Sequence, residues 1–162
     1  MIPDTQVKPG VPIDHFRWLA LYCNDHPPDA IVHLGDHYDM PSLSAYDRPG
    51  SHAAEGRRVV ADLDVGHRAL DLFSKHHAED ACPKYVTLGN HEDRVMRAAR
   101  EDAALVGLFG ETMFKFREYG WKPSEYQRII RVHGVWISHL FDVGPSGHPT
   151  GRAAGQASAK AQ

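Results

Sequence analysis

Two short stretches place potentially reactive side chains directly after apolar runs. In VTLGNHED (86–93) the apolar run stops at Gly89, and an amide, an imidazole and two carboxylates follow. In IVHLGDHYD (31–39) a similar run ends at Gly35, and two aspartates follow. Oxygen and imidazole nitrogen ligands suit manganese, iron, zinc or magnesium ions, and they do not favour soft copper. These residue types therefore predict a divalent metal site.

The elements around these stretches alternate between strands and helices. Residues 30–34 and 84–88 are predicted strands, because each is a short apolar run that ends in glycine. Helical spacing of apolar residues predicts helices over 12–26, 55–80 and 92–106. This alternation is typical of an α/β protein with strands buried on both faces. We therefore predict a βαβ arrangement.

The second half of the chain adds a helix face and a hairpin. In 92–106 the predicted inward stripe is Val95, Met96, Ala99 and Ala103, and the predicted solvated face is Arg94, Arg97 and Arg100. Residues 127–132 and 135–141 flank His133 and Gly134, a two-residue spacer that predicts a tight antiparallel hairpin. The last ten residues have the composition of a weak helix.

Polar residues recur at the predicted strand ends. The carboxyl ends of strands in an open α/β sheet form the ligand crevice, so side chains there converge. Taken singly, a Gly-Asp pair is an ordinary turn, and Asn-His-Glu-Asp is an ordinary start of a helix. Several acids close together repel one another unless a cation is present. The candidate ligands are Asp4, Gln6, Asp36, Asp39, Asn90, His91 and His139.

Length and charge narrow the class of protein. At 162 residues the chain is long enough for a single domain with its own core, which we assign to 1–162. The net charge of −3 provides no overall basic field for nucleic acid. No apolar run is long enough to span a membrane, and the N-terminus lacks the features of a signal peptide. We expect a cytoplasmic protein with no membrane partner.

The order of these pieces resembles the calcineurin-like metallophosphoesterase family, whose pattern is DxH, GDxxD, GNH followed by an acid, a later His and a terminal GHxH. The matching pieces here are D-T-Q at 4–6, G-D-H-Y-D at 35–39, G-N-H-E at 89–92 and the histidine at 139. The two glycine motifs match in full, and the sequence around them is similar to phage and prophage members. The resemblance implies a βαβαβ sandwich with helices flanking a mixed sheet.

The resemblance also implies roles for individual residues. Asp36 would bridge two divalent metal ions, Asp4 and Gln6 would complete the protein shell of one ion, and Asn90 and His139 would bind the other. His91 would be the general acid, and Asp39 would orient its ring. The implied reaction is hydrolysis of phosphate mono- or diesters by a hydroxide held on the two metal ions.

Three departures from the family pattern qualify the assignment. Gln6 replaces the usual histidine, and its amide oxygen shifts the expected metal preference towards Mn²⁺, although Fe, Zn and Mg also fit. Met40 follows Asp39 where phosphoprotein phosphatases carry arginine. The terminal GHxH is missing, since His148 stands in a different context, GHPTG. We therefore expect the domain to be incomplete at its C-terminus, with a further strand beyond Gln162.

Two alternatives to a phosphatase or phosphodiesterase remain open. A nuclease of the same superfamily is one, with a strand of nucleic acid lined by Arg94, Arg97, Arg100, Arg128 and Arg131. A non-catalytic module that binds metal or a partner is the other, motivated by Gln6 and the missing histidines. Substrate specificity is expected in residues 41–54 and 107–126. There Trp121 and Tyr126 favour core or lid packing over stacking on a base. The oligomeric state is left open.

Overall fold

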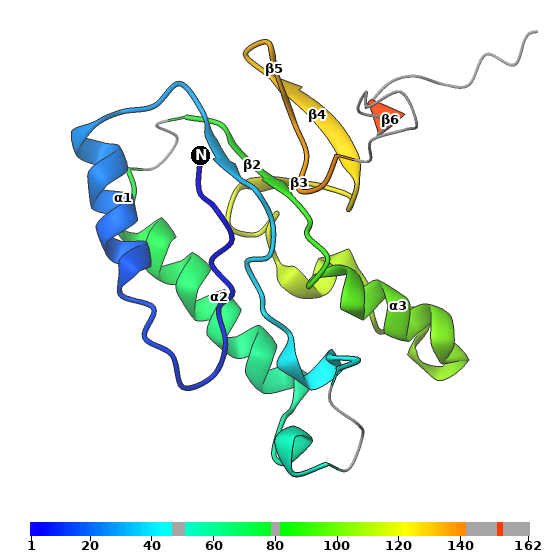
Figure 1. The fold of residues 1–162 in the computed structure, drawn as a ribbon. Coiled ribbons are helices and arrows are strands. Elements are labelled where there is room, and N and C mark those ends of the chain that lie inside the picture. The colour runs from blue at the N-terminus through cyan, green and yellow to red at the C-terminus, as the bar shows by residue number, and fades with distance from the viewer. Residues whose placement is uncertain (47–50, 79–81, 142–151, 154–162) are drawn as a thin grey trace, which may run out of the picture.

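The computed structural model describes residues 1–46, 51–78, 82–141 and 152–153 (Figure 1). Its central sheet has three parallel strands in the order β1-β2-β3, which are Ile31–His33, Lys84–Thr87 and Trp121–Ser124. Ile2 extends this sheet beside β1, because its N–H donates to the Val32 carbonyl at 2.7 Å and its carbonyl accepts from Leu34 at 2.9 Å. The parallel order brings the carboxyl ends of the strands to one edge. The predicted α/β class is confirmed.

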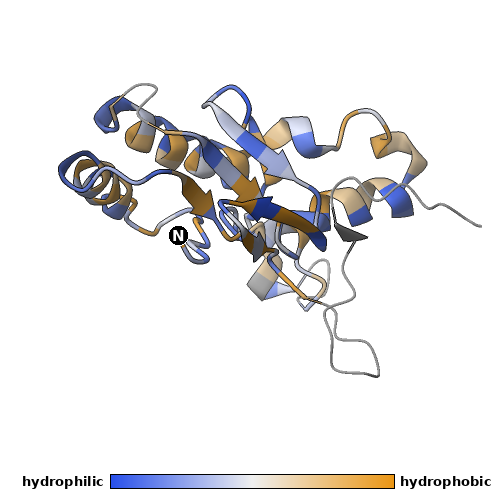
Figure 2. Ribbon diagram, turned by 90° about the horizontal axis from the view of Figure 1, so that it is seen from above, coloured by the Kyte–Doolittle hydropathy of each residue, from blue (hydrophilic) through white to orange (hydrophobic). Residues whose placement is uncertain are grey.

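Three α-helices accompany this sheet. Helix α1 (His15–Asp25) packs against α2 (Val59–His76), and the Phe73 ring of α2 lies 5.7 Å from that of Trp121 in β3. Helix α3 (Asp93–Glu101) is shorter than predicted, because the backbone becomes extended at Asp102. The helices alternate hydrophobic and hydrophilic residues in Figure 2, as amphipathic helices over a core do. The described residues also form four short 3-10 turns: Pro41–Leu43, His52–Ala54, Ala103–Leu105 and Glu111–Phe114.

A second sheet is built on the predicted hairpin. Strands β4 (Arg128–Val132) and β5 (Val135–Ile137) pair antiparallel, and β4 also pairs in parallel with β6 (Arg152–Ala153). His133 and Gly134 join β4 to β5 with φ values of 47° and 86°. Two successive positive φ angles are the mark of a type I′ turn, whose twist matches that of the paired strands. The strands are therefore divided between two sheets.

Gly66 allows α2 to approach the loop after β1. A Cβ atom at Gly66 would overlap the ring of Tyr38, which is fully buried in the core. The Tyr38 hydroxyl donates to the Phe114 carbonyl at 2.6 Å, so the ring is held at both ends. The loop between the two predicted ligands Asp36 and Asp39 is thus packed directly on α2.

Strand β3 was not predicted from the sequence. Its residues WKPS include a proline and a lysine, which are uncommon inside strands. Proline is tolerated here because β3 lies at the edge of the central sheet, with β2 as its one neighbour among the described residues. Trp121, at the start of β3, is 4% exposed and belongs to the core, as predicted.

In the part of the chain that the structure describes, no helix combines the length and the apolar character needed to cross a membrane. Ala153, the first residue of the predicted C-terminal helix, lies in strand β6, and the other residues of that helix and His148 lie outside the described residues.

Candidate metal centre

Two glycines let the loops after β1 and β2 come together. Gly35 has a φ of 98°, and a side chain there would meet the Thr87 carbonyl and the His139 ring. A Cβ at Gly89 would overlap the Asp36 carboxylate. These are the glycines of the two motifs found in the sequence. They are required because the two loops lie closer than any side chain would permit.

Glu92 joins the two loops from below. Its side chain is fully buried, and its carboxylate accepts hydrogen bonds from the backbone N–H groups of Asp36 (3.0 Å), Tyr38 (2.9 Å) and Gly89 (2.8 Å). Burial raises the pKa of Glu92, and the N–H groups of Tyr38 and Gly89 act in the opposite direction. Glu92 was not among the predicted site residues. Its place after GNH was the available signal, but two of its three partners are 54 and 56 residues away.

Three of the predicted metal ligands, Asp36, Asn90 and His139, lie close together at the loops that Glu92 connects. His139 Nε2 lies 3.1 Å from Asn90 Oδ1 and 3.6 Å from Asp36 Oδ2. Asp36 is 3% exposed, and its second oxygen accepts the N–H of His91 at 2.9 Å. A carboxylate, an amide oxygen and an imidazole nitrogen thus face one small space. This donor set fits a hard or borderline divalent cation.

The orientation of His139 supports the same interpretation. Its Nδ1 lies 2.7 Å from the Leu34 carbonyl, so in the neutral ring Nδ1 carries the proton and donates it. The Nε2 lone pair then points towards Asn90 and Asp36. Metal-binding histidines commonly have this arrangement, in which a carbonyl fixes the tautomer and leaves the other nitrogen free.

The N-terminal candidates lie at the rim. Asp4 Oδ1 is 4.0 Å from His139 Nδ1, and its side chain is 48% exposed. Gln6 has a φ of 43°, and its backbone N–H donates to the Asp36 carbonyl at 2.8 Å. The Gln6 residue itself is exposed. The backbone of this segment is therefore docked on the loop of Asp36, while its two side chains remain largely outside the cluster.

Within the described residues, no three or more histidine, cysteine, aspartate or glutamate side chains gather closely enough to hold a metal ion. The amide of Asn90 is therefore a necessary member of the candidate set, because Asp36 and His139 alone supply two ligands. Together these three residues fit one cation. The ligands predicted for the other cation, Asp4 and Gln6, are not brought together to the same degree.

A chain of hydrogen bonds secures the segment between Asp4 and Gln6. The Gly35 N–H donates to His33 Nδ1 at 3.1 Å, so His33 Nε2–H donates to the Thr5 hydroxyl at 3.1 Å. Thr5 then donates to His37 Nδ1 at 3.2 Å, and His37 Nε2–H donates to the Gly66 carbonyl at 3.1 Å. Burial lowers the pKa of His33, and it lowers that of His37 to about 4. Both rings are therefore neutral at pH 7.

His91 and Asp39 also lie together. His91 Nδ1 is 2.9 Å from Asp39 Oδ1 and 2.8 Å from the Asp39 carbonyl, and His91 Nε2 is 3.7 Å from Asp36 Oδ2. The other oxygen of Asp39 accepts from Lys8 at 2.9 Å. The ring of His91 is thus held on one side by Asp39, and its other nitrogen faces the metal-ligand cluster.

Arg94 was predicted to lie on a solvated helix face, and this prediction is wrong because its side chain is largely buried. Its side chain is 10% exposed, and Nη1 donates to the carbonyls of Asp39 (2.8 Å) and Met40 (3.2 Å). Its Nη2 lies 3.3 Å from His91 Nε2. Helical spacing could not reveal this, because the loop that buries Arg94 comes from a distant part of the chain. Arg97 and Arg100 are exposed as predicted.

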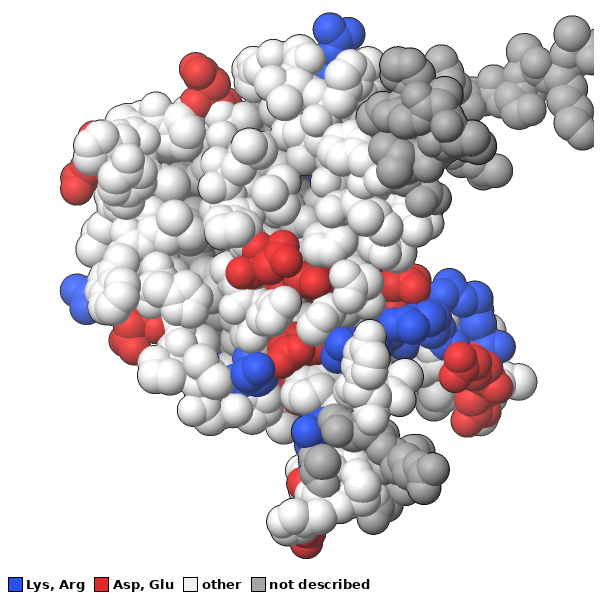
Figure 3. Space-filling view, viewed as in Figure 1, with Lys and Arg blue, Asp and Glu red and all other residues white. Residues whose placement is uncertain are grey.

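The charges form a pattern on this face of the molecule. Acidic side chains gather in its middle, and basic side chains lie on either side, with the larger basic group over α3 (Figure 3). An acidic centre between basic flanks suits a bound cation that meets an anionic substrate.

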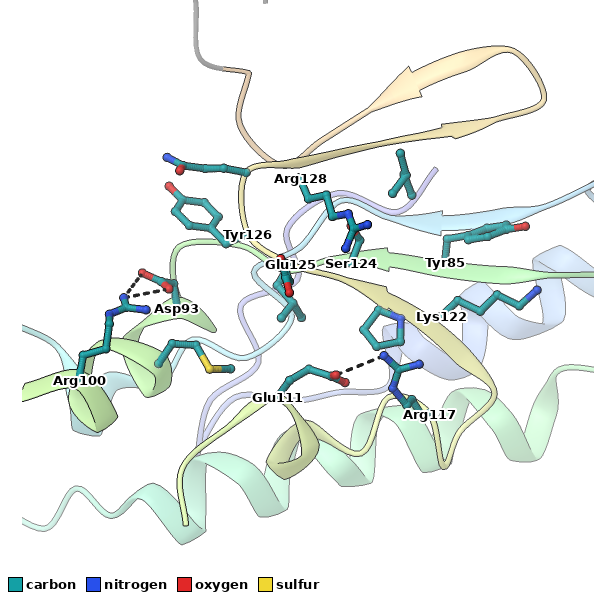
Figure 4. A pocket seen from close by; sticks show the side chains of 15 residues that line it. Tyr85, Asp93, Arg100, Glu111, Arg117, Lys122, Ser124, Glu125, Tyr126 and Arg128 are labelled. Atoms are coloured by element: carbon teal, nitrogen blue, oxygen red, sulfur yellow. Dashed lines mark hydrogen bonds and ion pairs between the residues drawn. The ribbon is translucent and has the colours of Figure 1, made fainter. Parts of the chain in front are cut away.

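A cavity of about 990 Å³ lies beside the cluster (Figure 4). Tyr126 lines it and also lies against the metal-ligand cluster, with its ring centroid 6.0 Å from that of His139. Asp93, the first residue of α3, lines the same end. None of the candidate metal ligands lines the cavity itself, and Tyr126 connects it to the cluster through His139.

The fold and the site define a class of protein, an α/β domain with a polar centre, a candidate cation site, at the carboxyl edge of a parallel sheet. Comparison with protein families then identifies the family to which this domain belongs. The model of the calcineurin-like phosphoesterase family matches residues 4–156, and the chain belongs to that family. Neither the comparison with curated proteins nor the one with solved structures gave a match.

Proposed function

We propose that this protein hydrolyses phosphate mono- or diesters with two divalent cations, Mn²⁺ in preference to Fe, Zn or Mg. The observation that carries the proposal is the convergence of Asp36 Oδ2, Asn90 Oδ1 and His139 Nε2, with separations of 3.1 and 3.6 Å from the histidine nitrogen. These are lone-pair donors brought together by two glycine loops. Membership of a phosphoesterase family supports the same reaction class.

In this proposal Asp36 would contribute to the binding of both cations. Asn90 and His139 would hold one of them, and Asp4 and Gln6 would contribute to the other. The cations would lower the pKa of water and neutralise phosphoryl oxygens. The buried Glu92 carboxylate keeps the loops of Asp36 and Asn90 at a fixed separation, so that their oxygens remain aimed at the same space.

His91 is the proposed general acid. Its Nδ1 proton is held by Asp39, so that Nε2 is the nitrogen that faces the centre and gives a proton to the leaving oxygen. Asp39 accepts the Nδ1 proton and fixes the orientation of the ring, and Lys8 in turn holds Asp39. Arg94 Nη2 lies 3.3 Å from His91 Nε2, the nitrogen that faces the centre, so its positive charge would be close to a bound phosphate.

Turnover and metal content test the proposal together. Purified protein is loaded with Mn²⁺, its metal stoichiometry is measured, and hydrolysis of bis-p-nitrophenyl phosphate is followed. We expect Asn90→Ala to lower the metal content, and His91→Ala to retain the metal while losing about 10²- to 10⁴-fold in kcat. His26→Ala, which removes an exposed histidine of the α1 end, is the matched control and should leave both readouts unchanged.

The alternative of a non-catalytic metal-binding module is supported by a separate observation. The exposure of Gln6 and the half-exposed Asp4 would also suit a module that binds one metal ion without catalysis. One bound ion per chain with no turnover on any phosphate ester would favour that module. Two bound ions with turnover that depends on His91 would exclude it.

A further inference from the structure

The cavity beside the candidate metal centre is lined by a buried polar group that lacks a hydrogen-bond partner in the described part of the chain. Ser124 is 8% exposed, and its hydroxyl is buried against the cavity without a hydrogen-bond partner among the described residues. A buried hydroxyl without a partner costs stability unless a bound molecule supplies the partner. This orphan hydroxyl is one of two signs of a ligand.

The other sign is a cation. Arg128 lines the cavity, and in the described part of the chain no carboxylate forms an ion pair with it. The two other arginines of the lining are each paired with a carboxylate, and Lys122 lies over the Tyr85 ring. Arg100 is paired with Asp93 at 3.3 Å, and Arg117 with Glu111 at 3.3 Å. Arg128 is therefore the lining arginine whose charge is available to an anion, and Figure 4 shows its side chain reaching into the middle of the cavity, near Ser124.

Aromatic rings stand at the two ends of the cavity. Tyr126 lies at the end next to His139, and Tyr85 lies at the other, where Lys122 Nζ sits 5.4 Å from its ring centroid (Figure 4). A tyrosine face stacks on any nucleobase, and an arginine between two such faces binds the phosphate that links two bases. The volume of about 990 Å³ is at the upper end for a small-molecule site.

We propose that this cavity binds a nucleotide unit of single-stranded nucleic acid, with a base on Tyr126, the adjacent phosphate on Arg128 and a base-edge hydrogen bond to Ser124. This rests on the proposed function, since it places the neighbouring phosphodiester at the centre formed by Asp36, Asn90 and His139. It assigns the substrate to nucleic-acid phosphodiesters. The negative net charge of −3 is compatible with this, because the cations that matter are local.

Binding is measured without turnover, so that its outcome is separate from that of the proposed reaction. Fluorescein-labelled pentathymidylate is titrated with the full chain in EDTA, and its anisotropy is followed over a range of salt concentrations. We expect Arg128→Ala to weaken binding about tenfold and to reduce the slope of log K against log[salt] by about 0.7, the value for one phosphate of a single strand.

Arg131→Ala is the matched control. Arg131 also belongs to β4, is exposed, and is one of the arginines that the sequence offered as a nucleic-acid contact. In the structure, however, it lies over the Trp136 ring at 5.3 Å and does not line the cavity. Its removal changes the net charge equally and should leave the affinity within about twofold, as for a surface charge away from the ligand. Equal losses in Arg128→Ala and Arg131→Ala would overturn the proposal, and so would no binding by the unmodified protein.

Ser124→Ala distinguishes a ligand contact from a structural role, because the two measured quantities, stability and affinity, should change in opposite directions. Removal of an orphan hydroxyl should stabilise the free protein, whereas removal of a ligand contact should weaken pentathymidylate binding about fivefold. Higher stability with unchanged affinity would remove Ser124 from the site and contradict the proposed contact.

An abasic pentamer with the same phosphates tests recognition of the base. We expect it to bind about tenfold more weakly than pentathymidylate, because each base stacked on an aromatic ring contributes to affinity. Equal affinity for the two oligomers would refute base binding. Nucleotide binding as described, without turnover of bis-p-nitrophenyl phosphate in Mn²⁺, would overturn the proposed reaction while leaving the cavity as a binding site.

Discussion

Replacement of Gly66 by alanine should destabilise the protein, although helix propensity alone predicts the opposite. In an exposed helix, alanine is about 1 kcal/mol more favourable than glycine. Here the new Cβ would overlap the Tyr38 ring, and both residues are buried. Overpacking of a core costs about 1–3 kcal/mol. Displacement of the ring would also break the hydrogen bond from the Tyr38 hydroxyl to the Phe114 carbonyl, at about 1 kcal/mol.

The net loss is therefore about 1–3 kcal/mol, which corresponds to a decrease in Tm of about 2–4 °C per kcal/mol for a domain of this size. The assay is urea unfolding followed by circular dichroism, in the presence of a chelator so that metal binding does not contribute. The decisive control is the same substitution in a Tyr38→Ala background. There the overlap is absent, and Gly66→Ala should be stabilising.

A higher stability of the single variant Gly66→Ala would refute this reasoning. It would mean that α2 and the loop of Tyr38 can separate at little cost. The same variant should bind Mn²⁺ less tightly, because Tyr38 lies between Asp36 and Asp39 and its displacement moves both loop ends.

Three further outcomes are expected. Glu92→Ala leaves three buried N–H donors unpaired and should cost about 3–5 kcal/mol in urea unfolding, whereas the exposed Glu101→Ala should cost less than about 0.5 kcal/mol. Burial lowers the pKa of His37 to about 4, so the unfolded chain binds a proton that the folded chain does not as the pH falls below 6.5. His37 alone should therefore lower the stability in chelator by about 2 kcal/mol between pH 7 and pH 5. Burial also lowers the pKa of His33, which acts in the same direction, and a flat profile would contradict the neutral rings. Arg94→Met should lower kcat on bis-p-nitrophenyl phosphate about tenfold while the Mn²⁺ content stays constant; an unchanged kcat would show that His91 is held without it.

The candidate site was predictable where its information is local. A glycine that ends an apolar run, followed by Asp36 or Asn90, marks a strand end in the chain itself, and the parallel order of strands then brings the two ends together. His139 was placed by its resemblance to a family histidine, and it does lie against Asn90.

Other features depend on contacts between distant segments, and spacing rules could not reveal them. Arg94 has the periodicity of a solvated helix face, but the loop at Asp39 and Met40 covers it. The role of Glu92 depends on N–H groups donated by another loop. Strand β3 was missed because proline and lysine are poor strand residues, and its place at a sheet edge, which makes them acceptable, is a tertiary property.

Pro123 in strand β3 has a consequence for behaviour at high concentration. Strands at the border of a sheet can recruit a strand from another molecule, because they present free N–H and C=O groups. Pro123 has no N–H to offer, and the lysine beside it places a charge on the same short strand. This border is thus poorly suited to intermolecular strand addition, which should help the chain resist self-association during folding.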